Sequence, residues 1–137
     1  MADVSRSTNV PLSPADTWEK IGVFDGLGFW ALGIESCTLE GNGVGSVRTI
    51  TLQGGQGTIK EQLESEDGAH YSYSILEGPL PVTNYLARLE VAADGDGTKV
   101  TWSAKFDPAG GFPEEKAVKI IENMFEGGLA SIAKKLG

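Results

Sequence analysis

The sequence predicts an α+β fold: an antiparallel sheet of about seven strands curved around one long C-terminal helix, with two short helices after the first strand. Between residues 34 and 107, alternating segments are separated by glycine-rich turns, which is typical of antiparallel strands. Apolar residues at helical spacing over 113–136 predict the long helix. The 137 residues fit one domain, spanning 1–137.

The N-terminal part predicts one strand and two short helices. Residues 3–10 form a weakly patterned first strand. Ser13 suits a helix N-cap and Pro14 the first helical position, so a helix begins there. Asp25 is positioned to cap a second, shorter segment around residues 27–30, whose glycines limit it to a turn or two.

Six further strands follow, joined by short turns that require neighbouring antiparallel strands. We expect them at 34–40, 44–53, 57–66, 69–77, 82–93 and 98–107. The turn Asp94-Gly95-Asp96-Gly97 resembles the start of a calcium loop. The twelfth position, however, is Lys105 where a glutamate ligand belongs, so we interpret it as a hairpin turn.

The long C-terminal helix is expected to cover the inner face of the sheet. Glu114 and Glu115 suit its N-terminus, because the helix dipole favours negative charge there. Gly127 and Gly128 interrupt the pattern at about 1 kcal/mol each relative to alanine, which indicates a kink or a close approach to another element. Since one helix is narrower than the sheet, we expect a cavity between them, and a helix break there could gate its entrance.

Two charged residues interrupt faces that should be buried. Arg48 shares a face with Ile50 on one predicted strand, and Glu61 shares a face with Ile59 on the next. With a two-residue loop at 54–55, Arg48 lies directly opposite Glu61; a longer loop shifts the pairing by one diagonal. An inward Arg and Glu indicate either a polar pair inside a cavity or a salt-bridged core.

Composition excludes several classes of function. The net charge of −8 argues against nucleic acid and against anionic membrane surfaces. Without a run of about 18 apolar residues or a signal peptide, we expect no membrane span and a cytoplasmic location. One cysteine, Cys37, and one histidine, His70, make a metal cluster or a Ser–His–Asp site unexpected, and we place His70 in solvent near a turn. We therefore expect no metal and no cofactor.

Several segments resemble a known superfamily. They are Pro14 to Trp18, Gly45-Ser-Val-Arg48, Glu61-Gln-Leu63, Tyr73-Ser-Ile75, Gly78-Pro-Leu-Pro-Val82, Tyr85, Gly97-Thr-Lys-Val-Thr-Trp102 and Gly128-Leu129. Together with the order of elements, they are similar to the START-like (SRPBCC, birch-pollen-allergen-like) superfamily, and within it to the polyketide cyclase/dehydrase-like group. The resemblance covers the whole chain. It implies a helix-grip fold with an apolar cavity between sheet and helix, and it leaves function open.

The resemblance also implies three catalytic positions. Arg48, Glu61 and Tyr85 stand where lachrymatory factor synthase-like members place a catalytic Arg, Glu and Tyr. Burial would raise the pKa of Glu61 toward neutrality and suit it to proton transfer, while Arg48 would lower that pKa and hold an oxyanion or carboxylate. Tyr85 would donate a hydrogen bond. Tyr71 and Tyr73 are weaker candidates, because the facing of their strand is ambiguous.

The expected partner is a small hydrophobic ligand, bound by a monomer or homodimer. Residues expected to contact it are Ile50, Ile59, Leu63, Ala87, Leu89, Trp102, Ala104, Phe106 and Met124. Three alternatives remain: cofactor-free acid–base catalysis of the cyclase, dehydratase or isomerase type; a carrier or sensor in which Arg48 anchors a ligand carboxylate; and a structural domain whose interior is filled and whose Arg–Glu pair only spans the core.

Overall fold

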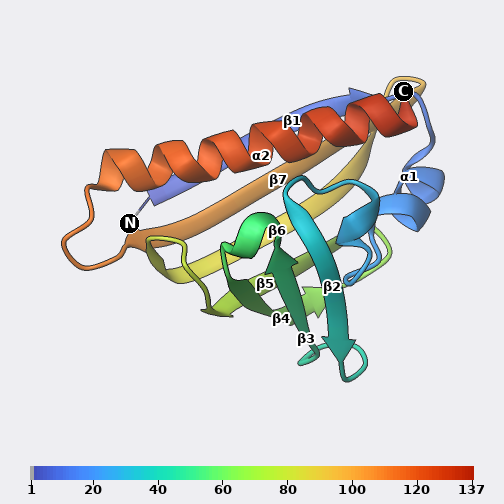
Figure 1. Cartoon of the computed structure of the whole chain (residues 1–137). Helices are drawn as coiled ribbons and strands as arrows, with labels where there is room; N and C mark the ends of the chain where they lie inside the picture. The colour runs from blue at the N-terminus through green and yellow to red at the C-terminus, as the bar shows by residue number, and fades with distance from the viewer. Residues whose placement is uncertain (1) are drawn as a thin grey trace.

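A computed structural model describes residues 2–137 and contains one seven-stranded antiparallel sheet with a long helix against its inner face (Figure 1). The strand order is β1-β7-β6-β5-β4-β3-β2. The strands are β1 (Ala2–Val10), β2 (Ile34–Glu40), β3 (Val47–Leu52), β4 (Thr58–Glu66), β5 (His70–Glu77), β6 (Val82–Asp94) and β7 (Gly97–Pro108). The helices are α1 (Pro14–Ile21), the short 3₁₀ turns η1 (Leu27–Phe29) and η2 (Gln53–Gly55), and α2 (Glu114–Leu136). The predicted α+β class and element order are confirmed.

The local signals near the N-terminus have different outcomes. Ser13 caps α1 as expected, since its Oγ accepts a hydrogen bond from the Asp16 backbone N–H at 3.2 Å. The expected cap at Asp25 is wrong: η1 begins after Gly26 and has no side-chain cap. Between α1 and β2 the chain contains only the three-residue η1 and is otherwise irregular.

The β3–β4 hairpin has the register expected from a two-residue loop. Arg48 pairs directly with Glu61, and Ile50 pairs with Ile59. The connection itself is longer and contains η2, with Gly54 at φ 70°, a conformation that glycine adopts without strain. Both charged side chains consequently enter the interior from adjacent positions on neighbouring strands.

Helix α2 lies lengthwise along β1 and β7, while β2, β3 and β4 lie farther from it (Figure 1). Its buried face includes Ile121, Phe125 and Ile132, each fully buried. The Phe125 ring stacks on Trp102 with centroids 4.1 Å apart. The helix covers one side of the inner face and leaves the other side for a different cover.

The helix α2 runs uninterrupted from Glu114 to Leu136, and close approach to another element explains one of its two glycines. A Cβ on Gly128 would lie 2.7 Å from the Trp102 ring and 3.1 Å from the Trp30 ring. A Cβ on Gly127 would meet only Leu32, at 3.4 Å. Gly128 is thus required by packing, and Gly127 is not. Within residues 2–137, no helix has the length and apolar character needed to cross a bilayer.

Candidate functional site

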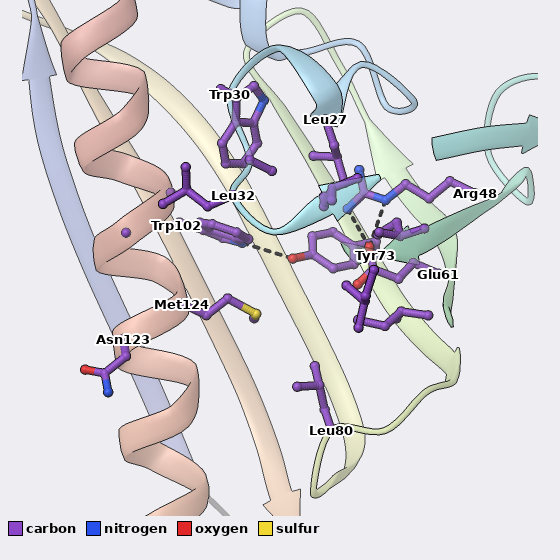
Figure 2. Close-up of a pocket in the computed structure, with 17 residues that line it drawn as sticks. Leu27, Trp30, Leu32, Arg48, Glu61, Tyr73, Leu80, Trp102, Asn123 and Met124 are labelled. Atoms are coloured by element: carbon purple, nitrogen blue, oxygen red, sulfur yellow. Dashed lines mark hydrogen bonds and ion pairs between the residues drawn. The ribbon is translucent and has the colours of Figure 1, made fainter. Parts of the chain in front are cut away.

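A cavity of about 220 Å³ lies between α2 and the β3–β5 part of the sheet (Figure 2). The segment after α1 closes it on one side and the loop before β6 on another. Its lining residues are Leu27, Trp30, Ala31, Leu32, Ile34, Arg48, Ile50, Leu52, Ile59, Glu61, Tyr73, Leu80, Trp102, Asn123, Met124, Gly127 and Gly128. Arg48 and Glu61 are the only charged members of this lining, so its charge is confined to one point, while Tyr73 and Asn123 add uncharged polar groups.

Arg48 and Glu61 form a buried ion pair at that point. Arg48 Nε donates to Glu61 Oε1 at 2.8 Å, and the second guanidinium contact, from Nη2, reaches the same oxygen at 2.6 Å. The side chains are only 2% and 8% exposed. Both contacts fall on Oε1, and Oε2 receives neither of them. The carboxylate therefore keeps one oxygen with capacity to accept a further hydrogen bond.

The third nitrogen of the Arg48 guanidinium connects the ion pair to neighbouring elements. Nη1 donates to the Phe24 carbonyl oxygen at 2.6 Å and reaches the Tyr71 hydroxyl at 3.3 Å. The guanidinium carbon also lies 4.1 Å from the centre of the Phe24 ring and 4.7 Å from that of Tyr73. Arginine is suited to such a site, because its planar cation stacks on aromatic rings while its N–H groups bond in plane.

The pair changes the protonation of both groups. Burial raises the pKa of the Glu61 carboxyl, and Arg48 offsets part of that effect by charge attraction and hydrogen bonding; the net pKa is above the ordinary value of 4.5. Burial lowers the pKa of Arg48, but the Glu61 charge and the neighbouring tyrosines outweigh it, so the pKa of Arg48 is raised. Arg48 remains a fixed cation, and Glu61 is the partner able to exchange a proton.

Tyr73 supplies the second polar group of the cavity. Its hydroxyl accepts a hydrogen bond from Trp102 Nε1 at 3.0 Å, which leaves its own O–H to donate (Figure 2). Burial holds the pKa of Tyr73 well above its usual range, with Tyr85 adding to the effect, so the hydroxyl stays protonated. A proton donor and a carboxylate thus line the same cavity.

Tyr85, expected in the site, does not line the cavity. It is buried behind Tyr73, with ring centroids 6.0 Å apart, and its hydroxyl makes no hydrogen bond within the described residues despite lying near Tyr73. Strand parity placed Tyr85 correctly on the inner face. That face also carries Tyr73, which lies between Tyr85 and the cavity.

The expected ligand-contacting residues divide into two groups. Ile50, Ile59, Trp102 and Met124 line the cavity. Leu63, Ala87, Leu89, Ala104 and Phe106 do not; they are buried in the packed core. We expected space beside the two alanines. Instead, Ala87 pairs with Tyr73 on one side and Ala104 on the other, so a large ring occupies the region that the small side chains leave.

Tyr71 and Tyr73, the weaker candidates from the sequence, belong to the site, and several other site residues were missed. Tyr71 and Tyr73 point inward because they pair with the inward Leu89 and Ala87 on β6. Their facing was ambiguous because the β4–β5 ladder shifts register between Lys60 and Glu61 and again after Leu63. Four other unexpected lining residues come from β2, β3, the loop before β6 and α2, namely Ile34, Leu52, Leu80 and Asn123. The rest belong to the irregular segment before β2. They are Phe24, Leu27, Trp30, Ala31 and Leu32. The only signal for them was an apolar composition too rich for an exposed loop.

A second polar cluster lies at the β4–β5 turn, and it corrects two expectations. His70 is only 14% exposed in its side chain; its Nδ1 lies 2.9 Å from Asp67 Oδ1 and its Nε2 lies 3.3 Å from Ser65 Oγ. A Ser–His–Asp chain of contacts therefore exists, contrary to expectation. Asp67 Oδ1 also accepts the backbone N–H groups of Ala69 and His70. Because none of the three lines the cavity, we interpret them as fixing the turn.

No three His, Cys, Asp or Glu side chains gather in metal-binding geometry in the part of the chain that the structure describes. The polar chemistry available in the cavity centres on Glu61, Arg48 and Tyr73, while the side chain of the lining residue Asn123 points away from them (Figure 2). An antiparallel sheet folded around a long helix, with an internal apolar cavity, defines the helix-grip class of α+β proteins.

The family model described as polyketide cyclase / dehydrase and lipid transport matches residues 1–137, and the chain belongs to this family. The chain is 31% identical to XoxI from Bacillus cereus, with a TM-score of 0.91 over 99% of this chain and 96% of that one. It is 30% identical to a Thermobifida fusca protein solved by NMR, with a TM-score of 0.85 over 100% and 94%.

The fold extends to more distant proteins. Ara h 8.0201, at 18% identity, has a TM-score of 0.79 over 98% of this chain and 97% of its own, which shows a shared fold alone. No curated protein matches the chain. The expected START-like (SRPBCC) superfamily and helix-grip fold are both confirmed.

Proposed function

We propose that this protein binds a small, largely apolar ligand in the cavity under α2, and that Glu61 transfers a proton to or from it without a cofactor. The observation that carries the proposal is the position of Glu61: one carboxylate, its pKa raised by burial, lines an otherwise apolar cavity and keeps Oε2 outside its ion pair. Groups of this kind suit general acid–base catalysis near neutral pH. The reaction classes are cyclisation, dehydration and isomerisation.

Each polar group has a separate role in this proposal. Glu61 is the acid or base. Arg48 is a positioning residue, since its contacts fix the Glu61 carboxylate and the Phe24 carbonyl. We assign to Tyr73 the hydrogen-bond donation expected of Tyr85, because the Tyr73 hydroxyl lines the cavity and stays protonated. A developing enolate or alkoxide next to Tyr73 would be stabilised by that donor.

The experiment is a thermal-shift screen of small aromatic and polyketide-like compounds on wild type and Glu61→Gln, followed by turnover assays of the hits. Glu64→Gln is the matched control, because Glu64 is on the same strand but exposed, with Oε2 bonded to Ser74. A ligand at 100 times its dissociation constant adds about 2.7 kcal/mol of stability. We expect hits on all three proteins and turnover lost only in Glu61→Gln. The absence of any hit on wild type would refute the proposal.

A carrier or sensor without catalysis is the second candidate. It is favoured by the lining, which is apolar apart from one neutralised ion pair and a few uncharged polar groups. Under this reading, the hits bind wild type and Glu61→Gln with similar affinity, and no hit is converted by either protein.

A further inference from the structure

Resting on the proposed ligand-binding function, we infer that the cavity selects compact, uncharged molecules that donate a hydrogen bond to Glu61 Oε2, such as phenols and alcohols, over carboxylic acids and long-chain lipids. The inference depends on three features: the saturation of Arg48, the charge balance of the lining and the size of the cavity.

Arg48 has little capacity left for a ligand carboxylate. Of the five N–H donors of a guanidinium, Nε and Nη2 each give one to Glu61, and Nη1 contacts the Phe24 carbonyl and the Tyr71 hydroxyl. A bidentate carboxylate would need two parallel donors on one edge of the fork. It would therefore have to displace Glu61 or break the bond to Phe24.

The charge balance also opposes an anionic ligand. The lining contains one cation, Arg48, and one anion, Glu61, and these neutralise each other in a buried pair. A ligand carboxylate entering beside them would lie near a like charge with no unpaired cation to compensate its loss of hydration. A neutral ligand avoids this cost.

The free hydrogen-bonding capacity of the cavity specifies the complementary group. Glu61 Oε2 accepts, and the Tyr73 hydroxyl, already accepting from Trp102, donates. A hydroxyl group matches both, because it donates one hydrogen bond and accepts another. A ligand that lacks a donor would leave the buried carboxylate oxygen without a partner.

Size sets the remaining limit. The cavity measures about 220 Å³, compared with the roughly 150 Å³ of an apolar protein cavity that holds benzene and the roughly 300–1,000 Å³ of drug-sized sites. The space accommodates one or two fused rings. The chain of a long fatty acid exceeds it, whereas a naphthalene-sized ring system fits.

The test measures affinity by titration calorimetry at pH 7 for four probes: 2-naphthol, naphthalene, 2-naphthoate and palmitate. We expect 2-naphthol to bind at least roughly tenfold more tightly than naphthalene and 2-naphthoate, which is the scale of one hydrogen bond to a charged group. Palmitate should show no saturable binding. Equal or tighter binding of 2-naphthoate, or saturable binding of palmitate, would overturn the inference while leaving ligand binding intact. No binding of any of the four probes would overturn this inference, whereas the proposed function fails only if the wider screen also gives no hit on wild type.

Three variants separate the contribution of the Glu61 carboxylate from that of the cavity's shape. In Glu61→Gln the anion is gone and Arg48 is unbalanced, so 2-naphthoate should gain affinity and the preference for 2-naphthol should narrow or reverse. Glu64→Gln should keep the wild-type ranking. Tyr73→Phe, which keeps the ring and removes the hydroxyl, should weaken 2-naphthol relative to naphthalene and provides a second test if Glu61→Gln folds poorly. An unchanged ranking in folded Glu61→Gln would contradict the assignment to Oε2.

Discussion

The inner face of the sheet is covered in two different ways. In the helix-covered half, β1 and β7 pack against α2 through fully buried apolar side chains such as Phe125 and Ile132. In the loop-covered half, β3 and β4 face the irregular residues 22–33, with the cavity and the Arg48–Glu61 pair between them. Regular apolar packing in one half supplies stability, which permits a cavity and a buried ion pair in the other.

The largest expected difference between the halves is in the stability lost when one side chain in each is truncated to alanine. Phe125→Ala removes a fully buried ring stacked on Trp102 and should lower the free energy of unfolding by about 3–5 kcal/mol. Leu32→Ala, at a cavity-wall residue that is 66% exposed, should change it by less than about 0.5 kcal/mol. Urea unfolding of both variants measures the difference, and equal costs would mean that the halves contribute alike.

Removing only one partner of the ion pair should strongly destabilise the protein. Arg48→Met leaves a buried carboxylate without its cation, which should cost about 3–5 kcal/mol at neutral pH. The double variant Arg48→Met/Glu61→Leu should recover most of that loss, because no charge remains buried. Denaturant unfolding of wild type, the two single variants and the double variant gives the free energies of a double-mutant cycle. A double variant as unstable as Arg48→Met would show that the loss arises from the Phe24 and Tyr71 contacts instead.

The two glycines of α2 form a matched pair at the boundary between the halves. Gly128→Ala forces a methyl group against Trp102 and should destabilise by about 1–3 kcal/mol through overpacking. Gly127→Ala meets only Leu32 and should gain up to about 1 kcal/mol from helix propensity. The unfolding temperature should therefore fall in Gly128→Ala and rise in Gly127→Ala. A gate at these glycines predicts slower ligand association when alanine replaces both, and unchanged on-rates in that double variant would dismiss it.

The smallest expected effect is a pH dependence from Glu61. Its folded-state pKa is raised, so the folded chain retains this proton to higher pH than the unfolded chain does. The stability it contributes is fully present below its ordinary pKa of 4.5 and is lost as pH rises through the folded pKa. From pH 4.5 upward, wild type should thus lose stability relative to Glu61→Gln. Unfolding free energies at a series of pH values test this, and parallel profiles would contradict it.

Residue positions could be predicted from the sequence where they depend on a local signal or on a regular alternation. Alternation along two strands located Arg48 opposite Glu61, and a helix-start signal located Ser13 as a cap. The facing of Tyr73 was left open, because its strand could not be aligned to a neighbour whose ladder shifts register in β4–β5. The contact of Phe24 with Arg48 was missed, since an irregular segment has no period from which to infer its position.

The bond from Arg48 to the Phe24 carbonyl has a consequence for motion. The same guanidinium holds the Glu61 carboxylate and ties down the segment that carries Leu27, Trp30 and Leu32. Protonation of Glu61 would weaken its attraction for Arg48, whose other hydrogen bond fixes the Phe24 carbonyl. Proton occupancy at one carboxyl is therefore expected to bear on the position of the cavity wall, because a single side chain contacts both.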